Sequence, residues 1–232
     1  MSHITFSLTQ LRAALLCAAK QDIRYYLNGV LIESNGGTTR IVGTNGHYLL
    51  ATDYRHGNSE AFIMPRDVCE MVCKIKSPVD FGTIEIETED KAVFNAATLT
   101  KVTGVVHVLD THIGFRSLEG LFPDYTRVIT PWVGTHDQMI AAQFNPEYYG
   151  KFATIAKLFG SKIDQFVLWQ RGDDAALISF QTLPEKINAT GVLMPMSVFK
   201  PGDNVGIPCT TQFRTKLLVD AKEPTHTSDV EA

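Results

Sequence analysis

The stretch QDIRYYLNGVLIESNGGTTRIVGTNGHYLLATDYR, residues 21–55, decides the fold of this chain. Asn-Gly dipeptides at 35–36 and 45–46 separate three runs that are rich in β-branched and aromatic residues. Asn-Gly tolerates positive φ at both central positions of a tight turn, so it is a strong hairpin signal. The stretch therefore predicts three consecutive antiparallel strands over residues 25–33, 38–44 and 47–54.

The same order of elements occurs three times along the chain. Residues 7–20 predict a helix before the first three strands, with Ser7 or Thr9 as its cap. A second copy has a strand at 60–65, a helix at 66–76 and strands at 82–90, 91–101 and 104–111. A third copy has a strand at 137–144, a helix at 146–160 and strands at 164–172, 175–181 and 188–196. One copy alone has too little core, so we expect an α+β protein whose copies pair, with the helices together and the sheets outside.

Composition excludes several classes of function. The 232 residues carry a net charge of −4, contain no long apolar run, and begin without a basic, apolar leader, so we expect no membrane span and a cytoplasmic protein. The four cysteines are too sparse for a disulfide framework, and Cys69 and Cys73 lack further ligands for a metal. No phosphate loop or nucleophile elbow is present. We expect buried free thiols, no cofactor and no enzymatic activity.

Charge is distributed unevenly between the predicted helices and the rest of the chain. The three helical segments, counted over residues 7–20, 64–76 and 146–162, together carry +5, whereas the remainder carries −9. A positive helix layer suits a surface that faces phosphates. The alternative is a set of solvated helix faces, which commonly carry lysine and arginine.

Five stretches resemble one family, in the family's own order. They are QDIRYYLNGVLIE (21–33), TNGHYLLA (44–51), LFPDYTRV (121–128), FNPEYY (144–149) and GVLMPMSV (191–198). Over roughly residues 4–198 the chain resembles the bacterial sliding clamp, the beta subunit of DNA polymerase III. The resemblance implies the DNA clamp fold, with repeated β-α-β-β-β half-domains, helices on the inner face and antiparallel sheets outside.

The resemblance covers only part of a clamp subunit. Residues 1–131 resemble the whole middle domain, and residues 132–198 resemble the second half of the last domain. The family's first domain and the first half of its last domain have no counterpart. Residues 199–232 extend beyond the point where the family normally ends, and their polar end, 221–232, predicts a loose segment.

By position, the resemblance implies a cleft for short linear peptides of polymerases, the clamp loader and repair proteins. An apolar floor with a few polar groups suits such ligands, and methionine adapts to several of them. Tyr48 and Ser197 stand where the family usually has arginine, and Asn45 where it usually has aspartate. The implied cleft residues are Leu27, Thr44, Gly46, His47, Leu49, Pro123, Arg127, Val128, Asn145, Tyr148, Val192, Met194, Pro195 and Met196.

Two hypotheses follow. A clamp ring carries twelve half-domains, so a ring of this chain needs four copies, about 103 kDa from a 25.7 kDa chain, around non-specifically held duplex DNA. Alternatively, the chain is a clamp-like adapter or decoy that binds peptides without encircling DNA. Taken singly, an Asn-Gly turn, His47 or the MPM strand indicates only local structure. Candidate DNA contacts are Arg12, Lys20, Gln21, Tyr25, Lys74, Lys151 and Lys157.

Overall fold

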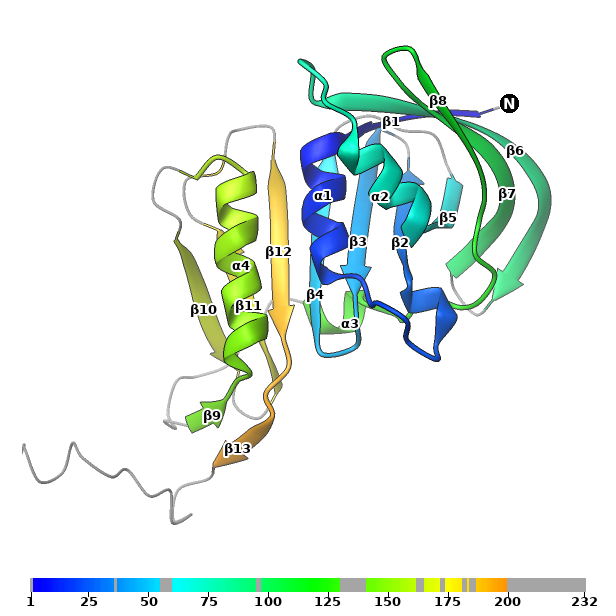
Figure 1. Ribbon diagram of the computed structural model, residues 1–232. Helices are drawn as coiled ribbons and strands as arrows, with labels where there is room; N and C mark the ends of the chain where they lie inside the picture. Colours follow the sequence, from blue (N-terminus) through cyan, green and yellow to red (C-terminus); the bar gives the residue numbers. More distant parts are fainter. Residues whose placement is uncertain are drawn as a thin grey trace, which may run out of the picture. The chain divides into compact units, whose positions relative to one another are not determined.

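The first repeat begins with a strand and a helix that a serine joins. The computed structural model in Figure 1 describes residues 2–35, 37–54, 60–94, 97–129, 141–161, 165–171, 174–180, 183 and 187–199. Ser7 ends β1 and caps α1, because its side chain accepts a hydrogen bond from the Gln10 N–H. The elements of this repeat are β1 (Ser2–Ser7), α1 (Leu8–Cys17), β2 (Gly29–Asn35), β3 (Thr38–Thr44) and β4 (Tyr48–Tyr54).

Two further repeats have the same order of elements, which confirms the threefold pattern. The second contains β5 (Glu60–Pro65), α2 (Arg66–Lys74), β6 (Phe81–Phe94), β7 (Ala97–Val108) and β8 (Thr111–Arg116). A short α3 (Thr126–Ile129) follows it. The third contains β9 (Ala141–Gln143), α4 (Pro146–Leu158), β10 (Phe166–Arg171), β11 (Asp174–Phe180) and β12 (Asn188–Leu193), and β13 (Ser197–Phe199) pairs with β9.

The strands form two large antiparallel sheets. One has the order β1-β6-β7-β8, and the other has the order β10-β11-β12-β4-β3-β2-β5. The first and second repeats exchange their first strands, since β1 pairs with β6 and β5 pairs with β2. The larger sheet continues into the third repeat through β4 and β12.

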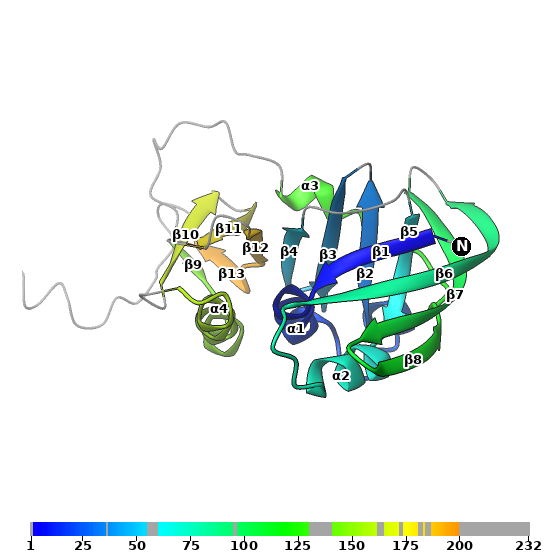
Figure 2. The same cartoon turned by 90° about the horizontal axis from the view of Figure 1, so that it is seen from above.

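The three longer helices lie on one side of the sheets. Figure 2 shows α4 and α1 along one side of the strands β10–β12 and β2–β4, with α2 next to β8. The layer lies close against the larger sheet at two glycines: a Cβ on Gly43 would lie 1.9 Å from the Ala14 carbonyl oxygen, and one on Gly191 would lie 2.6 Å from the Phe152 ring. A larger residue at either position would push α1 or α4 off its strand.

Two buried clusters fill the space between the helices and the sheets. One lies between the first two repeats and contains Phe6, Leu11 and Phe62. The other joins α1 to α4 and contains Ala13 and Phe152. Within the described ranges, no helix is long and apolar enough to cross a membrane.

Several sequence-based boundaries are wrong. Residues 25–27 form a short 3-10 helix, because Asn28 folds back to bond the backbone of Asp22, and β2 begins only at Gly29. The predicted strand 104–111 is divided by a turn at Leu109, whose φ is 53°. The predicted strand 91–101 belongs partly to β6 and partly to β7.

The first helix is shorter than the expected 7–20, because α1 ends at Cys17. A unit comprising residues 1–198 is compact by itself, and residues 199–232 form a second unit of which only Phe199 is described. The expected boundary at 131/132 lies outside the described residues, as do Cys209 and the polar end 221–232.

Candidate functional site

The junction of β4 and β12 brings together residues that are far apart in the sequence. Leu49 pairs with Val192, and Tyr48 pairs with Leu193. The Leu49 and Val192 side chains belong to an apolar cluster that contains no residue of α1, α2 or α4. They therefore lie on the sheet face opposite the helices, and both are almost fully covered.

The segment around α3 covers this face of the sheet. Phe122 and Tyr125 are buried against the Leu49 cluster, and Val128 packs at its edge. The Tyr125 hydroxyl donates a hydrogen bond to Glu33, and burial raises the pKa of that hydroxyl. The Arg40 guanidinium lies 6.0 Å from the centroid of the Tyr125 ring. These contacts fix the segment that presents Pro123 and Arg127 to solvent.

The turn between β3 and β4 is held by its own side chains. The Thr44 hydroxyl donates to the Tyr48 carbonyl at 2.8 Å and accepts from the Gly46 N–H at 3.0 Å. The Asn45 side-chain oxygen accepts from the N–H groups of His47 and Tyr48. Gly46 has φ +90°, which suits glycine, and His47 projects into solvent at the end of the turn.

A second polar group forms beside this turn, from three separate stretches. The His47 carbonyl accepts a hydrogen bond from the Met194 N–H at 2.8 Å. The His47 ring stacks on Tyr148, with centroids 5.9 Å apart and planes at 17°. Asn145 caps α4 by accepting from the Glu147 N–H at 2.9 Å, which fixes the start of the helix that carries Tyr148.

The exposed apolar residues of the predicted cleft lie next to these groups. Met194 is 40% exposed and Met196 is 70% exposed, and Pro195 between them is partly buried. Four predicted residues offer little contact surface, because Leu27 is fully buried and Thr44, Leu49 and Val192 are 4%, 6% and 2% exposed. Leu49 and Val192 lie in the same cluster as Phe122 and Tyr125.

Tyr48, the residue that replaces the family's usual arginine, is a core residue here. Its ring lies 4.7 Å from the Tyr148 ring and 6.4 Å from the Phe152 ring, and burial raises the pKa of its hydroxyl. Tyr48 therefore joins the first repeat to the third. The side chain of Ser197 lies outside the described part of the chain.

The candidate DNA contacts differ in their exposure and in their contacts within the protein. The Arg12 side chain donates to the carbonyls of Cys73 and Ile75 at 3.2 and 3.1 Å, so it caps the end of α2. Lys151 lies 3.9 Å from the Glu147 carboxylate. Exposed candidates are Lys20, Gln21, Tyr25, Lys74 and Lys157.

Sequence reasoning missed the residues that anchor the site from below. Arg24 pairs with the Asp22 carboxylate at 2.8 Å and donates to the Asn45 carbonyl at 3.3 Å, which connects the loop after α1 to the turn. The hydrogen bond from Arg24 lowers the pKa of Asp22 to about 2. Phe122 and Tyr125 were missed as well, although their spacing beside a proline was a usable signal for an anchored loop. Among described residues, no group of histidine, cysteine and acidic side chains is placed to hold a metal.

Known proteins with this arrangement are DNA clamps. No protein-family model matches the chain. The beta sliding clamp of Pseudomonas aeruginosa is 33% identical over 115 residues, which cover 48% of this chain and 28% of that clamp. The beta sliding clamp of Escherichia coli K12 is 31% identical over 137 residues, or 55% of this chain and 34% of that clamp. The crystal structure of the Pseudomonas aeruginosa DNA polymerase sliding clamp with ligand superimposes with a TM-score of 0.61 at 18% identity, covering 84% of this chain and 66% of that one.

The fold is therefore that of a DNA clamp. Over about half of its length the chain is similar in sequence to bacterial beta sliding clamps, and the matched stretch spans about a third of the length of these curated relatives.

Proposed function

We propose that this protein acts as a sliding-clamp-type processivity factor in DNA replication, which binds linear peptides of a polymerase and a clamp loader on the sheet face at the β4–β12 junction. One observation carries the proposal. His47, Tyr148 and Met194, which come from three separate stretches, lie together beside the apolar floor of Leu49 and Val192. The role is binding and positioning, with no chemical step.

The surface has the chemistry that a short peptide requires. Met194 and Met196 offer adaptable apolar area that is already exposed, so the floor need not open fully to receive an apolar anchor. The His47 ring and the Arg127 side chain are exposed at the rim, where polar groups orient a peptide backbone. Peptides with leucine or phenylalanine anchors are the ligand class that suits this combination.

Peptide binding is tested by fluorescence anisotropy with a labelled synthetic peptide that carries leucine and phenylalanine anchors. Met194→Ala removes apolar contact worth about 1–2 kcal/mol, so the Kd should rise about 5- to 30-fold. Met71→Ala is the matched control, because Met71 is 45% exposed but lies on α2. An equal Kd for the two variants contradicts the assignment of the cleft.

The helix layer is proposed to face duplex DNA, with Lys20, Lys74 and Lys157 as phosphate contacts. Retention on circular DNA that is lost when the DNA is cut would show encirclement. Exchanging Lys20 and Lys74 for glutamate should weaken contact with DNA and flatten its salt dependence, since each phosphate contact releases counterions. Unchanged salt dependence would remove these lysines from the DNA surface.

A second candidate function, a peptide-binding adapter or decoy that does not hold DNA, is favoured by one observation. Arg12 is committed to capping α2, and Lys151 is near Glu147, so two of the candidate cations are engaged within the protein. Peptide binding together with no retention on circular DNA would select this function.

A further inference from the structure

The first two repeats are joined by a reciprocal exchange of strands. β5 ends at Pro65, which directly precedes α2, and it pairs along β2 from Gly29 to Ser34. β1 ends at Ser7, which directly precedes α1, and it pairs along β6. Each repeat therefore donates the strand before its helix and accepts its partner's strand at the open edge of its own sheet.

Contacts at the ends of the exchanged strands are reciprocal as well. The Leu8 N–H donates to the Asp80 carbonyl at 3.3 Å, and the Arg66 N–H donates to the Asn28 carbonyl at 3.1 Å. The Arg66 side chain donates to the carbonyls of Ala18 and Ala19 at the end of α1, as Arg12 does at the end of α2. The exchange thus pairs two helices as well as two strand edges.

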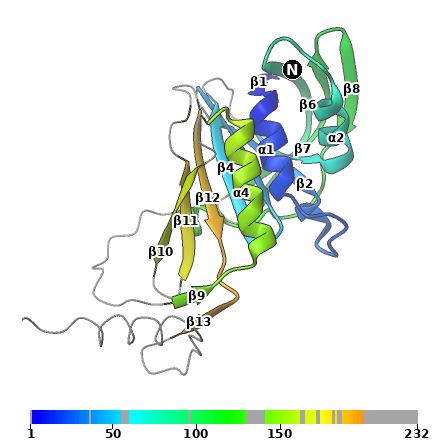
Figure 3. The same ribbon diagram turned by 60° about the vertical axis from the view of Figure 1, so that its left-hand side comes forward.

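The third repeat has both elements of such an exchange, and among the described strands neither β9 nor β10 pairs with a strand of the first or second repeat in the way that β1 and β5 do. Among the described strands, β10 is at the edge of the larger sheet, and it stands in the order of its repeat where β2 and β6 stand in theirs (Figure 3). β2 is paired on both sides and mostly buried, whereas no residue of β10 with a described side chain is buried. β9 precedes α4 as β1 and β5 precede their helices, and within the described chain its one strand partner is β13.

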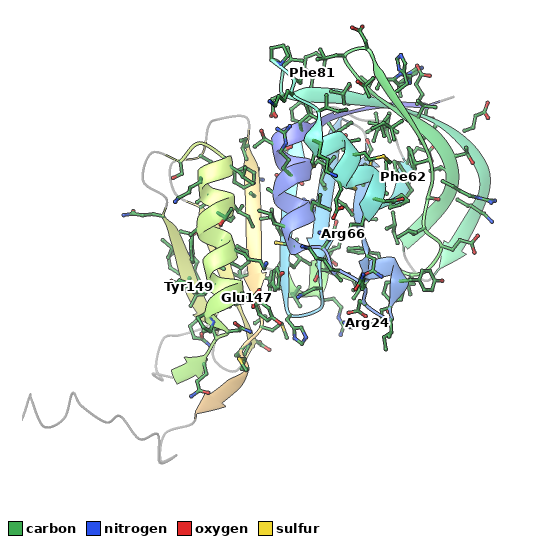
Figure 4. All side chains as sticks on the ribbon, viewed as in Figure 1. Arg24, Phe62, Arg66, Phe81, Glu147 and Tyr149 are labelled. Atoms are coloured by element: carbon green, nitrogen blue, oxygen red, sulfur yellow. The ribbon has the colours of Figure 1, made fainter. Side chains whose placement is uncertain are left out.

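Apolar side chains gather along this open edge. Trp169 on β10 is 53% exposed, and Tyr149 on α4 is 44% exposed. The Tyr149 ring lies 4.8 Å from the Phe166 ring of β10, and Figure 4 shows Tyr149 on the side of α4 away from α1. An edge strand with exposed aromatic residues is a template for pairing with another strand.

We propose that β10 of one copy accepts β9 of a second copy, while the second copy's β10 accepts the first copy's β9. The second copy is the occupant because donor and acceptor lie on the same repeat, so two copies satisfy each other by a two-fold contact. The inference goes beyond the proposed function, because it requires neither a peptide nor DNA. A two-fold exchange joins copies in pairs and excludes a three-chain ring built through this contact.

The internal exchange fixes the register of the proposed one. Met64, one residue before its helix cap, lies opposite Val30, and both face the helices. Phe144 likewise lies one residue before the cap of its helix, Asn145. Phe166 corresponds to Val30, because each faces the helices and lies the same number of residues before the end of its strand at the hairpin. Phe144 therefore lies opposite Phe166 of the second copy, and Gln143 lies opposite Val167.

The internal hydrogen bonds show what kind of pair Gln143 and Val167 form. The hydrogen bond from the Arg66 N–H to the Asn28 carbonyl makes these two residues a hydrogen-bonded pair. Hydrogen-bonded and non-hydrogen-bonded pairs alternate along an antiparallel ladder, so Met64 and Val30 form a hydrogen-bonded pair and Ile63 and Leu31 do not. Gln143 and Val167 correspond to Ile63 and Leu31, so they form a non-hydrogen-bonded pair. The Cα atoms of such a pair lie about 4.5 Å apart, within the range of a disulfide. The third repeat lacks the counterpart of the Arg66–Asn28 hydrogen bond, because Pro146, which begins α4 as Arg66 begins α2, has no N–H to donate.

Cross-linking between two single variants tests the exchange. Gln143→Cys and Val167→Cys chains, both also Cys73→Ser and Cys209→Ser, are mixed and oxidised with glutathione disulfide. Cys17 and Cys69 are fully buried and can stay. A non-reducing gel should show a product of about twice 25.7 kDa from the mixture and from neither variant alone.

The matched control mixes Gln143→Cys with Trp169→Cys, which places the second thiol on the same face of β10 but about 7–8 Å away along the diagonal. The control should give at least several-fold less product, because a Cα separation above about 7 Å is too long for a disulfide. Equal products from the two mixtures, or no product while the wild-type mass is that of a dimer or larger, overturn the exchange. A monomer at every concentration also overturns it. The peptide titration of Met194→Ala is read separately, so either idea can fail without the other.

Discussion

Replacing Gly43 by alanine should separate α1 from the larger sheet. An added Cβ would lie 1.9 Å from the Ala14 carbonyl oxygen, about 1.5 Å short of the 3.4 Å at which ordinary contact begins. The obstacle is backbone within a helix, so no side chain can swing aside. Either α1 or β3 must move, and such overpacking costs about 1–3 kcal/mol. The cost should exceed the small entropic gain that alanine has over glycine in the unfolded chain.

Urea unfolding followed by circular dichroism measures this loss. With a slope of about 2 kcal/mol/M, the midpoint should fall by about 0.5–1.5 M. Gly114→Ala is the matched control, since Gly114 also lies in a strand, β8, and its Cβ would meet nothing within 4 Å. The Gly114 variant should be as stable as the wild type or slightly more so. If the two variants unfold at the same urea concentration, the close approach of α1 to β3 is refuted.

Three other perturbations follow from the site and its supports. Tyr48→Arg should lower the free energy of unfolding by about 3 kcal/mol or more, because it buries a charge where a ring is packed. Tyr48→Phe should cost under about 1 kcal/mol, because the hydroxyl makes only a long hydrogen bond of 3.5 Å. Similar denaturation curves for the two variants would contradict the packing of this ring. The hydrogen bond from Arg24 lowers the pKa of Asp22 from 3.8 to about 2, so the stability that this pair contributes is present above about pH 4 and is lost as the pH falls through about 2. In an acid titration, the difference in stability between the wild type and Asp22→Asn should shrink in that pH window. A constant difference would refute the pairing. In a Cys209→Ser background, a thiol reagent at about pH 8 should react slowly with Cys73, because burial raises the pKa of that thiol to about 11. Cys17 is fully buried and should not react until the protein unfolds. Fast labelling of Cys17 would show that α1 opens locally.

The sequence by itself determined the order of elements and the resemblance to bacterial sliding clamps. Apolar spacing and the Asn-Gly turns placed the three repeats, because hairpins and amphipathic helices depend on neighbouring residues. The same local signals failed at Leu109 and at Tyr25–Leu27. At Leu109 a left-handed turn conformation overrides the strand propensity of the residues. At Tyr25–Leu27 the hydrogen bonds of the Asn28 side chain do so.

Only the tertiary structure decided how the repeats join. Nothing in the local pattern around Leu49 or Val192 says that they are cross-strand partners, because pairing between strands more than 100 residues apart depends on the whole sheet. Burial likewise sorted the predicted site, turning Leu27 inward while leaving His47 and Met194 in solvent. The place of β10 at the edge of the larger sheet also emerged only from the fold, because it depends on how all the other described strands pair.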